Sequence, residues 1–328
     1  MMKATARAHT NIALVKYWGK KDPTLMLPQT DSLSLTLDRF YTTTSVEFDP
    51  TLAADQIQID QAPAAPKVAQ RVSQFLDLVR PQGCFARVAS VNNVPMAAGL
   101  ASSASAFAAL AAAASWAQGL HPSRTELSRL ARRGSGSATR SIFGGLVEWH
   151  AGHDDQSSFA EPIQEHVDFG LEMLAILLDT RQKKIGSRRG MQHVVATSPY
   201  YPTWREVVAH DMAAMKLAIA VQDIDQIGHL AQTNALRMHA LNLAADPGFT
   251  YFNAATLKAM ETIDHLRETG VSCYYTMDAG PNVKVIYDRR DRETILTALT
   301  PQFGADHLVV AKPGPGVEEL TDERDSLI

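Results

Sequence analysis

Apolar side chains alternate with polar ones over several short stretches of the chain, and this two-residue spacing predicts β-strands. Residues 32–37 have the sequence SLSLTL, and residues 41–48 are crowded with threonine, valine and aromatic side chains. Two further stretches are joined by a tight turn through residues 278–282, which predicts a hairpin. The predicted strands are residues 32–37, 41–48, 85–91, 142–149, 174–179, 271–277, 283–287 and 307–311.

Other stretches carry apolar residues three and four positions apart, the spacing that predicts one buried face of a helix. One of them is rich in alanine and places Phe107, Leu110 and Ala114 on a single stripe. Another, residues 123–134, begins with the serine and glutamate spacing of a capping box and ends at a glycine. The predicted helices are residues 68–79, the stretch around Phe107, and residues 123–134, 204–222, 224–241, 255–269 and 292–299.

The mixture of strands and helices predicts an α+β fold, and 328 residues suffice for two domains of ~150 residues each. Residues 181–190 are basic, contain glycine and show no apolar spacing, so the boundary is expected near them. We therefore predict an N-terminal lobe of residues 1–182 and a C-terminal lobe of residues 183–328. The polar tail from Lys312 onward is expected to be held loosely.

The composition is that of a globular protein, with 45% hydrophobic and 20% charged residues. A net charge of −4 supplies no overall positive field, so neither nucleic acid nor a membrane is expected as a partner. The apolar stretch 104–117 is shorter than the ~20 residues that cross a bilayer, and residues 1–10 hold no signal core. Cys84 and Cys273 stand far apart, which argues against a disulfide framework, and the histidines show no paired ligand spacing. The expected location is cytoplasmic.

A run of small residues leads into the alanine-rich helix and is the strongest local signal for a binding site. Residues 95–105 have the sequence PMAAGLASSAS. Small side chains let backbone N–H groups approach an anion, and the helix N-terminus adds a favourable dipole. The alternative is a serine N-cap before a closely packed helix, and the loop lacks the spacing of a P-loop. The candidate ligands of phosphate or metal are Gly99, Ala101, Ser102, Ser103 and Ser105.

Residues 132–140 alternate small residues and hydroxyls between arginines. Glycines permit close approach, hydroxyls donate hydrogen bonds, and an arginine fork can bind a carboxylate or phosphate at two points. The alternative is a solvated helix end. The candidates for an anion site here are Ser135, Ser137 and Arg140.

Two further stretches add polar groups to apolar surroundings. In NIALVKYWGK, residues 11–20, the polar heads of Asn11, Tyr17 and Lys20 interrupt an apolar run that could equally be an edge strand with a charged rim. Residues 183–189 concentrate positive charge, which most often means solvated surface.

Asp278 is the only carboxylate in the strand and turn unit of residues 274–285. It is a candidate base or hydrogen-bond acceptor, and the alternative is that it closes an Asx turn.

Together these segments resemble the diphosphomevalonate decarboxylase family, and the resemblance runs through nearly the whole chain. The stretches that carry it are NIALVKYWGK, PMAAGLASSASAFAALA, RRGSGSATRSIFGG and YTMDAGPNVKV. The serine-rich loop alone indicates a GHMP-type kinase, whereas KYWGK with GSGSATRS and MDAGPN indicates the decarboxylase branch. The resemblance implies a two-lobed GHMP kinase-type fold, with a ribosomal protein S5 domain 2-like N-terminal lobe and a ferredoxin-like C-terminal lobe. The active site is then expected in the cleft between them.

The resemblance also implies a reaction in the mevalonate pathway of isoprenoid biosynthesis. Mevalonate 5-diphosphate and ATP give isopentenyl diphosphate, carbon dioxide, ADP and phosphate. ATP phosphorylates the tertiary C3 hydroxyl, and loss of that phosphate together with the carboxylate leaves the double bond. The implied cofactors are ATP and Mg²⁺, and the implied assembly is a homodimer.

By motif match, the resemblance assigns roles to individual residues. Nucleotide phosphates fall to Ser102, Ser103 and Ser105, with Ser102 as a metal ligand. The implied substrate-binding residues are Asn11, Tyr17, Lys20, Ser135, Ser137, Arg140 and Arg188. The implied catalytic residues are Asp278 beside the C3 hydroxyl, Arg140 near the substrate carboxylate, and Lys183 near the transferring phosphoryl group, a place for which Lys184 competes.

One stretch departs from the family pattern. Gln29, Thr30 and Asp31 stand where the family commonly carries asparagine-rich residues, and a carboxylate there could alter substrate or metal contacts.

Two other functions fit the same scaffold. One is a mevalonate 3-kinase or a monophosphate-specific decarboxylase, and the other is a catalytically silent regulator that binds a nucleotide or metabolite. The presence of Lys20, Arg140, Arg188 and Asp278 favours the diphosphate decarboxylase.

Overall fold

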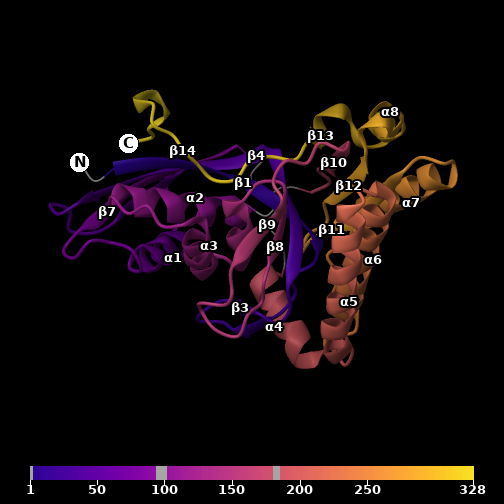
Figure 1. Cartoon of the computed structure of the whole chain (residues 1–328), viewed down its shortest axis with the longest axis horizontal. Helices are drawn as coiled ribbons and strands as arrows, with labels where there is room; N and C mark the ends of the chain where they lie inside the picture. The colour runs from indigo at the N-terminus through magenta and orange to yellow at the C-terminus, as the bar shows by residue number, and fades with distance from the viewer. Residues whose placement is uncertain (1–2, 94–101, 180–184) are drawn as a thin grey trace.

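The protein folds into two lobes that lie side by side (Figure 1), as described by a computed structural model for residues 3–93, 102–179 and 185–328. The first lobe is built on an eight-stranded sheet and the second on a four-stranded sheet. Helices accompany both sheets, so the predicted α+β class is confirmed. Within the described residues, no helix has the length and apolar character needed to span a membrane.

The sheet of the first lobe follows the order β14-β1-β4-β7-β5-β6, and β8 and β9 extend it beside β4. Its central pair is antiparallel, with β1 running alongside β4 over most of its length. A short separate pair, β2 (Lys20–Asp22) and β3 (Leu27–Pro28), follows β1 in the chain. The strands of the large sheet are β1 (Lys3–Val15), β4 (Ser32–Asp49), β5 (Gln56–Ile59), β6 (Ala62–Pro63), β7 (Phe85–Asn93), β8 (Leu146–Trp149), β9 (Ala160–Gln164) and β14 (Glu318–Glu319).

Helices α1 (Pro66–Leu76), α2 (Ser102–Ala117) and α3 (Arg124–Gly134) lie together beside this sheet (Figure 1). Helix α2 contacts both β1 and β4, and its alanine side chains are almost entirely buried. Because alanine is short, the helix backbone can approach the sheet closely. The first turn of α2 is thereby fixed against the middle of the central strands, where Ser105 Oγ lies 2.8 Å from Thr42 Oγ1. The 3₁₀ segment η1 (Gly136–Ile142) follows α3.

The second lobe has the antiparallel order β11-β12-β10-β13. Helices α5 and α6 pack against each other, and α6 contacts both β11 and β1. Helix α6 therefore connects the two sheets. The elements of this lobe are β10 (Leu171–Ile176), α4 (Ser187–Thr197), α5 (Tyr201–Ala220), α6 (Ile224–Leu243), α7 (Ala254–Glu268), β11 (Cys273–Met277), β12 (Val283–Asp288), α8 (Arg292–Phe303) and β13 (Leu308–Ala311).

The two lobes share one hydrophobic core. Leu14 and Leu35 from the first sheet belong to the same buried cluster as Met173, Met215 and Ile227 from the second lobe. A common core opposes independent movement of the lobes, because separating them would expose these side chains to water. Side chains contributed by the two lobes are thus held at fixed positions relative to one another.

Several predicted elements are confirmed, with altered bounds. The capping box of Ser123 and Glu126 is formed. The predicted strands 32–37 and 41–48 are one continuous strand, β4. The predicted strand 142–149 begins only at Leu146, because Ile142 belongs to η1 and Gly145 has a φ of 65°, which a strand cannot contain. Helix α4 begins at Ser187, within the basic segment 181–190 that shows no apolar spacing.

The predicted boundary at 182/183 stays a prediction, and the strand pairing favours an earlier one. Strand β10 precedes that boundary, yet it pairs with β12 and β13 in the sheet of the second lobe. We therefore propose that the second lobe starts before Leu171.

The prediction of a loosely held C-terminal tail is wrong. Strand β14 pairs with β1, with Glu319 opposite Ala6, and the Gly314 N–H donates to the Thr36 carbonyl at 2.8 Å. The chain end thus returns to the first lobe, so both termini lie on it (Figure 1). Backbone pairing holds this segment, which side-chain composition does not reveal.

Gly144→Ala is expected to destabilise the fold by about 1–3 kcal/mol, the range for overpacking. A Cβ at Gly144 would lie 2.8 Å from the Gly314 carbonyl oxygen and 2.9 Å from the Gly316 nitrogen, where backbone has little room to yield. The measurement is the free energy of unfolding by denaturant titration. Gly186→Ala is the matched control, since nothing lies within 4 Å of its Cβ position and its φ is an ordinary −68°. Equal stability of the two variants would contradict the prediction.

Candidate active site

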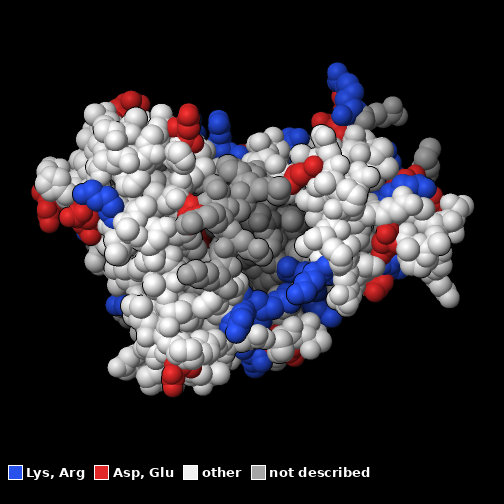
Figure 2. Space-filling view, turned by 180° about the vertical axis from the view of Figure 1, so that it is seen from behind, with Lys and Arg blue, Asp and Glu red and all other residues white. Residues whose placement is uncertain are grey.

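A cavity of about 360 Å³ is lined by residues of both lobes. A hollow between the two halves of the molecule is visible in Figure 2, with Lys and Arg side chains gathered along one edge. The polar groups predicted from five separate stretches of the sequence meet in the cavity. The predicted residues that line it are Asn11, Tyr17, Lys20, Ser103, Ser135, Ser137, Arg140, Arg188 and Asp278.

Asp278 is clamped between two buried lysines. Its Oδ1 lies 2.9 Å from Lys16 Nζ, and its Oδ2 lies 3.2 Å from Lys284 Nζ. The lysine side chains are 2% and 1% exposed, whereas that of Asp278 is 22% exposed and lines the cavity. Asp278 follows β11, and its two carboxylate oxygens face lysines instead of closing an Asx turn.

The charges of this cluster fix its protonation. Burial alone would raise the pKa of the Asp278 carboxyl, but Lys16 and Lys284 outweigh burial and hold that pKa well below its ordinary value. Burial lowers the pKa of Lys16, and Asp278 opposes that change. Nearby His239 is kept neutral, because burial and then the charge of Lys16 lower its pKa to about 3. Asp278 is therefore an ionised hydrogen-bond acceptor.

Arg140 is held rigidly at the cavity wall. Its Nε donates to Ser34 Oγ at 2.9 Å and to Asn11 Oδ1 at 3.2 Å, and its Nη1 donates to Ser32 Oγ at 2.6 Å. Among the described residues Nη2 has no such partner, so it is available to a ligand. Burial lowers the pKa of this guanidinium to about 10, which leaves it charged at neutral pH. The arrangement suits a carboxylate or phosphate.

A second group of cations forms another part of the cavity wall. Burial, followed by repulsion from Arg188 and Arg71, lowers the pKa of Lys20 to about 8. Burial also lowers the pKa of Arg71 to about 10, and its Nη2 donates to the Gly134 carbonyl at 2.6 Å. Lys20, Arg71 and Arg188 are therefore three cations on one part of the wall. Asp278 is the one carboxylate among the described residues that line this cavity, so the three cations create a local site for a multiply charged anion.

Hydroxyl groups line the wall beside these cations. Ser103 Oγ lies 3.2 Å from Ser135 Oγ, which lies 3.4 Å from Ser137 Oγ. The Asn11 amide donates to the Ser137 carbonyl at 2.9 Å and so ties β1 to η1. The stretch from Ser135 to Arg140 therefore contributes to the cavity wall and is not a solvated helix end, whereas Arg132 pairs with Asp155 elsewhere.

Gly136 lets aromatic rings close this wall. A Cβ there would lie 2.9 Å from both the Tyr17 ring and the Trp149 ring. The two rings pack edge to face with centroids 4.8 Å apart. Burial raises the pKa of the Tyr17 hydroxyl, so it stays a neutral donor.

Not every predicted residue reaches the cavity. Ser105 is fully buried behind the wall, where its Oγ lies 2.8 Å from Thr42 Oγ1, so its role as a nucleotide ligand stays a prediction. Asn11 lines the cavity, but its amide already binds protein groups. Gly99, Ala101, Lys183 and Lys184 lie outside the described residues, as does the side chain of Ser102.

Three residues of the site were not predicted from the sequence as functional candidates. Lys16 stands in the NIALVKYWGK motif but looked like part of a basic strand end. Lys284 is a single charge between valines of a buried strand, which is itself a signal, because lysine is rarely buried without a partner. Arg71 lies on a helix that showed only an apolar stripe, and no local pattern distinguishes it.

A second, mostly apolar cavity of about 300 Å³ adjoins the first. Arg71 lines both of them. The walls come from α1, α2, β4, β5 and β7 and include Ile57, Val68 and Phe107. Its size and apolar walls suit a flat ring system.

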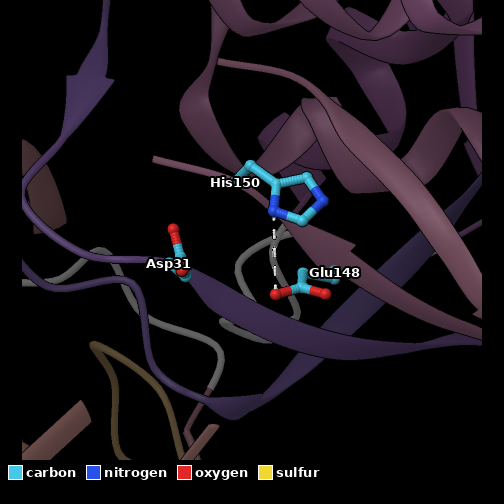
Figure 3. A group of neighbouring side chains, drawn as sticks. All are labelled: Asp31, Glu148 and His150. Carbon is cyan, nitrogen blue, oxygen red and sulfur yellow. Dashed lines mark ion pairs between the residues drawn. The ribbon is translucent and has the colours of Figure 1, made fainter. Parts of the chain in front are cut away.

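The group of Asp31, Glu148 and His150 (Figure 3) has ligand atoms within 4.8 Å of one another. Each side chain already has a protein partner. Glu148 Oε1 lies 2.6 Å from Lys216 Nζ on α5, and His150 Nε2 lies 2.8 Å from Glu161 Oε1. Asp31 Oδ1 accepts from the Ala151 N–H at 2.6 Å, and Asp31 does not line the main cavity. The group is an ion-pair cluster that joins the lobes, and the expected effect of Asp31 on substrate stays a prediction.

Comparison with known proteins gives the same picture in both halves of the chain. Residues 8–160 match the family model of a diphosphomevalonate decarboxylase-like N-terminal domain, and residues 173–321 match that of a mevalonate 5-diphosphate decarboxylase C-terminal domain. The gap between the two matches, residues 161–172, runs from β9 to the start of β10.

Relatives match over almost the full chain. A diphosphomevalonate decarboxylase of Candida albicans is 33% identical, covering 98% of this chain and 99% of the relative. The crystal structure of mevalonate diphosphate decarboxylase from Staphylococcus aureus is 42% identical with a TM-score of 0.93, covering 97% of this chain and 98% of that one. A solved complex of MDDEF with MVAPP, AMPPCP and magnesium is 46% identical with a TM-score of 0.92 and the same coverage.

These matches confirm the expected two-lobed GHMP kinase-type fold. Taken with the cavity that joins both lobes, they show that the chain belongs to the diphosphomevalonate decarboxylase family.

Proposed function

We propose that the main cavity binds mevalonate 5-diphosphate and carries out its ATP-dependent decarboxylation to isopentenyl diphosphate, with release of carbon dioxide, ADP and phosphate. The observation that carries the proposal is the position of Asp278 between Lys16 and Lys284, in the same cavity as Arg140 and a separate group of cations. Mevalonate 5-diphosphate has a tertiary hydroxyl for Asp278, a carboxylate for Arg140 and a diphosphate for the separate group of cations.

The diphosphate is assigned to the cations and hydroxyls. Lys20, Arg71 and Arg188 supply charge, and the hydroxyls of Ser135 and Ser137 supply hydrogen bonds. Tyr17 lies on the same wall as a neutral donor. The diphosphate is remote from the reacting carbon, and its binding to these cations would hold the substrate in one orientation.

Asp278 is assigned to the C3 hydroxyl. Its ionised carboxylate accepts a hydrogen bond from that hydroxyl and directs the oxygen at the terminal phosphate of ATP. A carboxylate whose pKa is so low is a weak base, so orientation is favoured over early removal of the proton. In a loose phosphoryl-transfer transition state the proton leaves late, and the transferred phosphoryl group can accept it.

Arg140 is assigned to the substrate carboxylate. Its fixed fork holds the carboxylate until the bond between C1 and C2 breaks and carbon dioxide leaves. The electron pair of that bond forms the double bond between C2 and C3 as phosphate departs from C3. Lys16 lies beside Asp278 and supplies positive charge near the departing phosphate.

The second cavity is assigned to the adenine base of ATP. It is apolar, and the wall residue Arg71 connects it with the main cavity, so base and phosphates could lie in adjoining spaces. The MDDEF complex contains the ATP analogue AMPPCP and magnesium, which supports ATP and Mg²⁺ as cofactors.

The Asp278 oxygens already face Lys16 and Lys284, so the described residue that fits Mg²⁺ best is a neutral oxygen donor. The Ser103 hydroxyl lines the main cavity, and Mg²⁺ prefers oxygen ligands and usually keeps phosphate oxygens and water. Bound there, Mg²⁺ would neutralise phosphate charge. Ser102 as a metal ligand, and Lys183 or Lys184 near the transferring phosphoryl group, stay part of the proposal, as do the homodimer and the cytoplasmic location.

Asp278→Asn is expected to lower kcat at least ~100-fold, the scale for losing a positioned acid or base. The amide keeps the shape of the carboxylate but not its charge, so it orients the hydroxyl poorly. ADP and carbon dioxide are measured from mevalonate 5-diphosphate, mevalonate 5-phosphate and mevalonate. Asp306→Asn, at an exposed carboxylate of the same lobe, is the control and should retain full activity.

Release of ADP without carbon dioxide by the unaltered protein would favour a 3-kinase. Preference for the 5-phosphate would favour the monophosphate enzyme, and nucleotide binding without turnover would favour a silent regulator. Nearly full turnover by Asp278→Asn would remove Asp278 from the mechanism.

Binding of the diphosphate substrate is expected to weaken as the pH rises through about 8, the pKa of Lys20. Lys20 is charged below that pH and attracts the anion, and it is neutral above that pH. The measurement is kcat/KM for mevalonate 5-diphosphate from pH 6.5 to about 9.5. Lys20→Gln should have a low value without this step, whereas Lys20→Arg, charged throughout, should keep activity at the alkaline end. An unchanged step in Lys20→Gln would contradict the assignment.

Val68→Trp is expected to raise the KM for ATP about 10-fold or more, with the KM for the diphosphate substrate unchanged, because a ring placed in the second cavity competes with adenine. The Val68 side chain is 42% exposed at the wall of that cavity, so the variant should fold. Leu78→Trp is the matched control, since Leu78 is 44% exposed and does not line the cavity. Equal KM values for ATP in the two variants would place adenine elsewhere.

A further inference from the structure

The backbone at Lys16 is held by a side chain of the other lobe. Strand β1 ends at Val15, whose partner in β4 is Leu33, so the Lys16 N–H lies beyond the strand pairing. A buried N–H needs an acceptor. Asn234 Oδ1 on α6 provides it at 2.8 Å, and Asn234 itself is fully buried.

The orientation of this amide is set by a second buried residue. Asn234 Nδ2 donates to Asp211 Oδ2 on α5 at 2.8 Å. Asp211 is 1% exposed, and Arg237 Nη1 lies 2.8 Å and 3.1 Å from its two oxygens. A carboxylate paired with arginine can only accept hydrogen bonds, so Asn234 must present its NH₂ to Asp211 and its oxygen to Lys16.

The position of the Lys16 backbone determines where its amine can reach. Nζ donates to the Ala13 carbonyl at 2.7 Å and lies 2.9 Å from Asp278 Oδ1. The side chain therefore folds back over the strand end to meet Asp278. If the backbone at Lys16 moved, the amine would lose one or both partners, because a buried lysine has few other places to go.

We infer that Asn234 and Asp211 are positioning residues for Lys16: the chain from Asp211 through Asn234 fixes the end of β1, so that the Lys16 amine reaches Asp278. This inference rests on the proposed role of Lys16 and Asp278 in the reaction. Neither Asn234 nor Asp211 lines the main cavity. Their contribution to the rate is made through Lys16.

The test is a double-mutant cycle on kcat. Asn234→Leu keeps the size of the side chain but removes both hydrogen bonds, and it is expected to lower kcat about 100-fold, the cost of a displacement of about 1 Å. KM for both substrates should stay within about threefold, since the binding groups are elsewhere. In a Lys16→Ala background the same substitution should cost less than about threefold, because the group it positions is gone.

An equal loss in both backgrounds would mean that Asn234 acts on the fold and not through Lys16, and would overturn the inference. An unchanged kcat for Asn234→Leu would overturn it as well. Asn253→Ala is the matched control, since the Asn253 side chain caps α7 by accepting from the Thr256 N–H. It should lower the melting temperature and leave kcat unchanged. If Asn234→Leu does not fold, the cycle is run with Asp211→Asn, which preserves shape but no longer dictates the amide orientation.

A readout that needs no substrate separates this inference from the proposed function. In protein labelled with [¹³Cε]lysine, the Lys16 resonance is identified by its absence from Lys16→Ala. Loss of the Asp278 contact in Asn234→Leu should lower the pKa of Lys16 further, because Asp278 opposes the effect of burial. An unmoved resonance would overturn the inference, and a moved resonance in a protein without decarboxylase activity would overturn only the function. The groups that face Lys16 and must be kept unchanged are Asp278, Lys284, Arg140 and His239.

Discussion

The clamp of Lys16 and Lys284 on Asp278 is the interaction on which the site depends. It joins a residue that follows a strand of the first sheet to two residues around the hairpin of the second. Buried charges are costly unless they are paired, and loss of one partner leaves the others uncompensated. The three groups therefore require each other, and their pairing requires that the two lobes meet in one fixed arrangement. The shared core supplies that arrangement.

Helix α6 contacts strands of both lobes. This helix packs against β11, which leads to Asp278, and against β1, which leads to Lys16. One rigid element thus sets both sides of the clamp. The ion pair between Glu148 on β8 and Lys216 on α5 adds a second link at the edge of the lobes (Figure 3 shows Glu148). Only Glu148 is buried in this pair, whereas Lys216 is 44% exposed to water, which weakens the attraction, so the apolar core holds the lobes together.

The sequence predicted those parts of the structure that depend on neighbouring residues. Apolar spacing indicated most strands and helices, and the hydroxyl and arginine motifs indicated the cavity wall. Long-range features were missed. The pairing of β10 with the second sheet and the docking of the tail near Gly144 are backbone contacts between distant segments. Lys16, Lys284 and Arg71 belong to a basic strand end, a buried strand and an amphipathic helix, and only the fold shows that they face one cavity.

The cavity is strongly cationic although the whole chain carries a net charge of −4. Burial and mutual repulsion lower the pKa of Lys20 to about 8, and burial lowers those of Arg71 and Arg140 to about 10. These groups are thus less stable as cations in the cavity wall than they would be in water. A bound polyanion would offset the repulsion among Lys20, Arg71 and Arg188. The side chains of Lys20 and Arg71 are already partly buried, so binding requires less further removal of water from them. The free energy that folding spends on holding like charges together is returned when the substrate binds, and this favours binding by a highly charged anion over a neutral one.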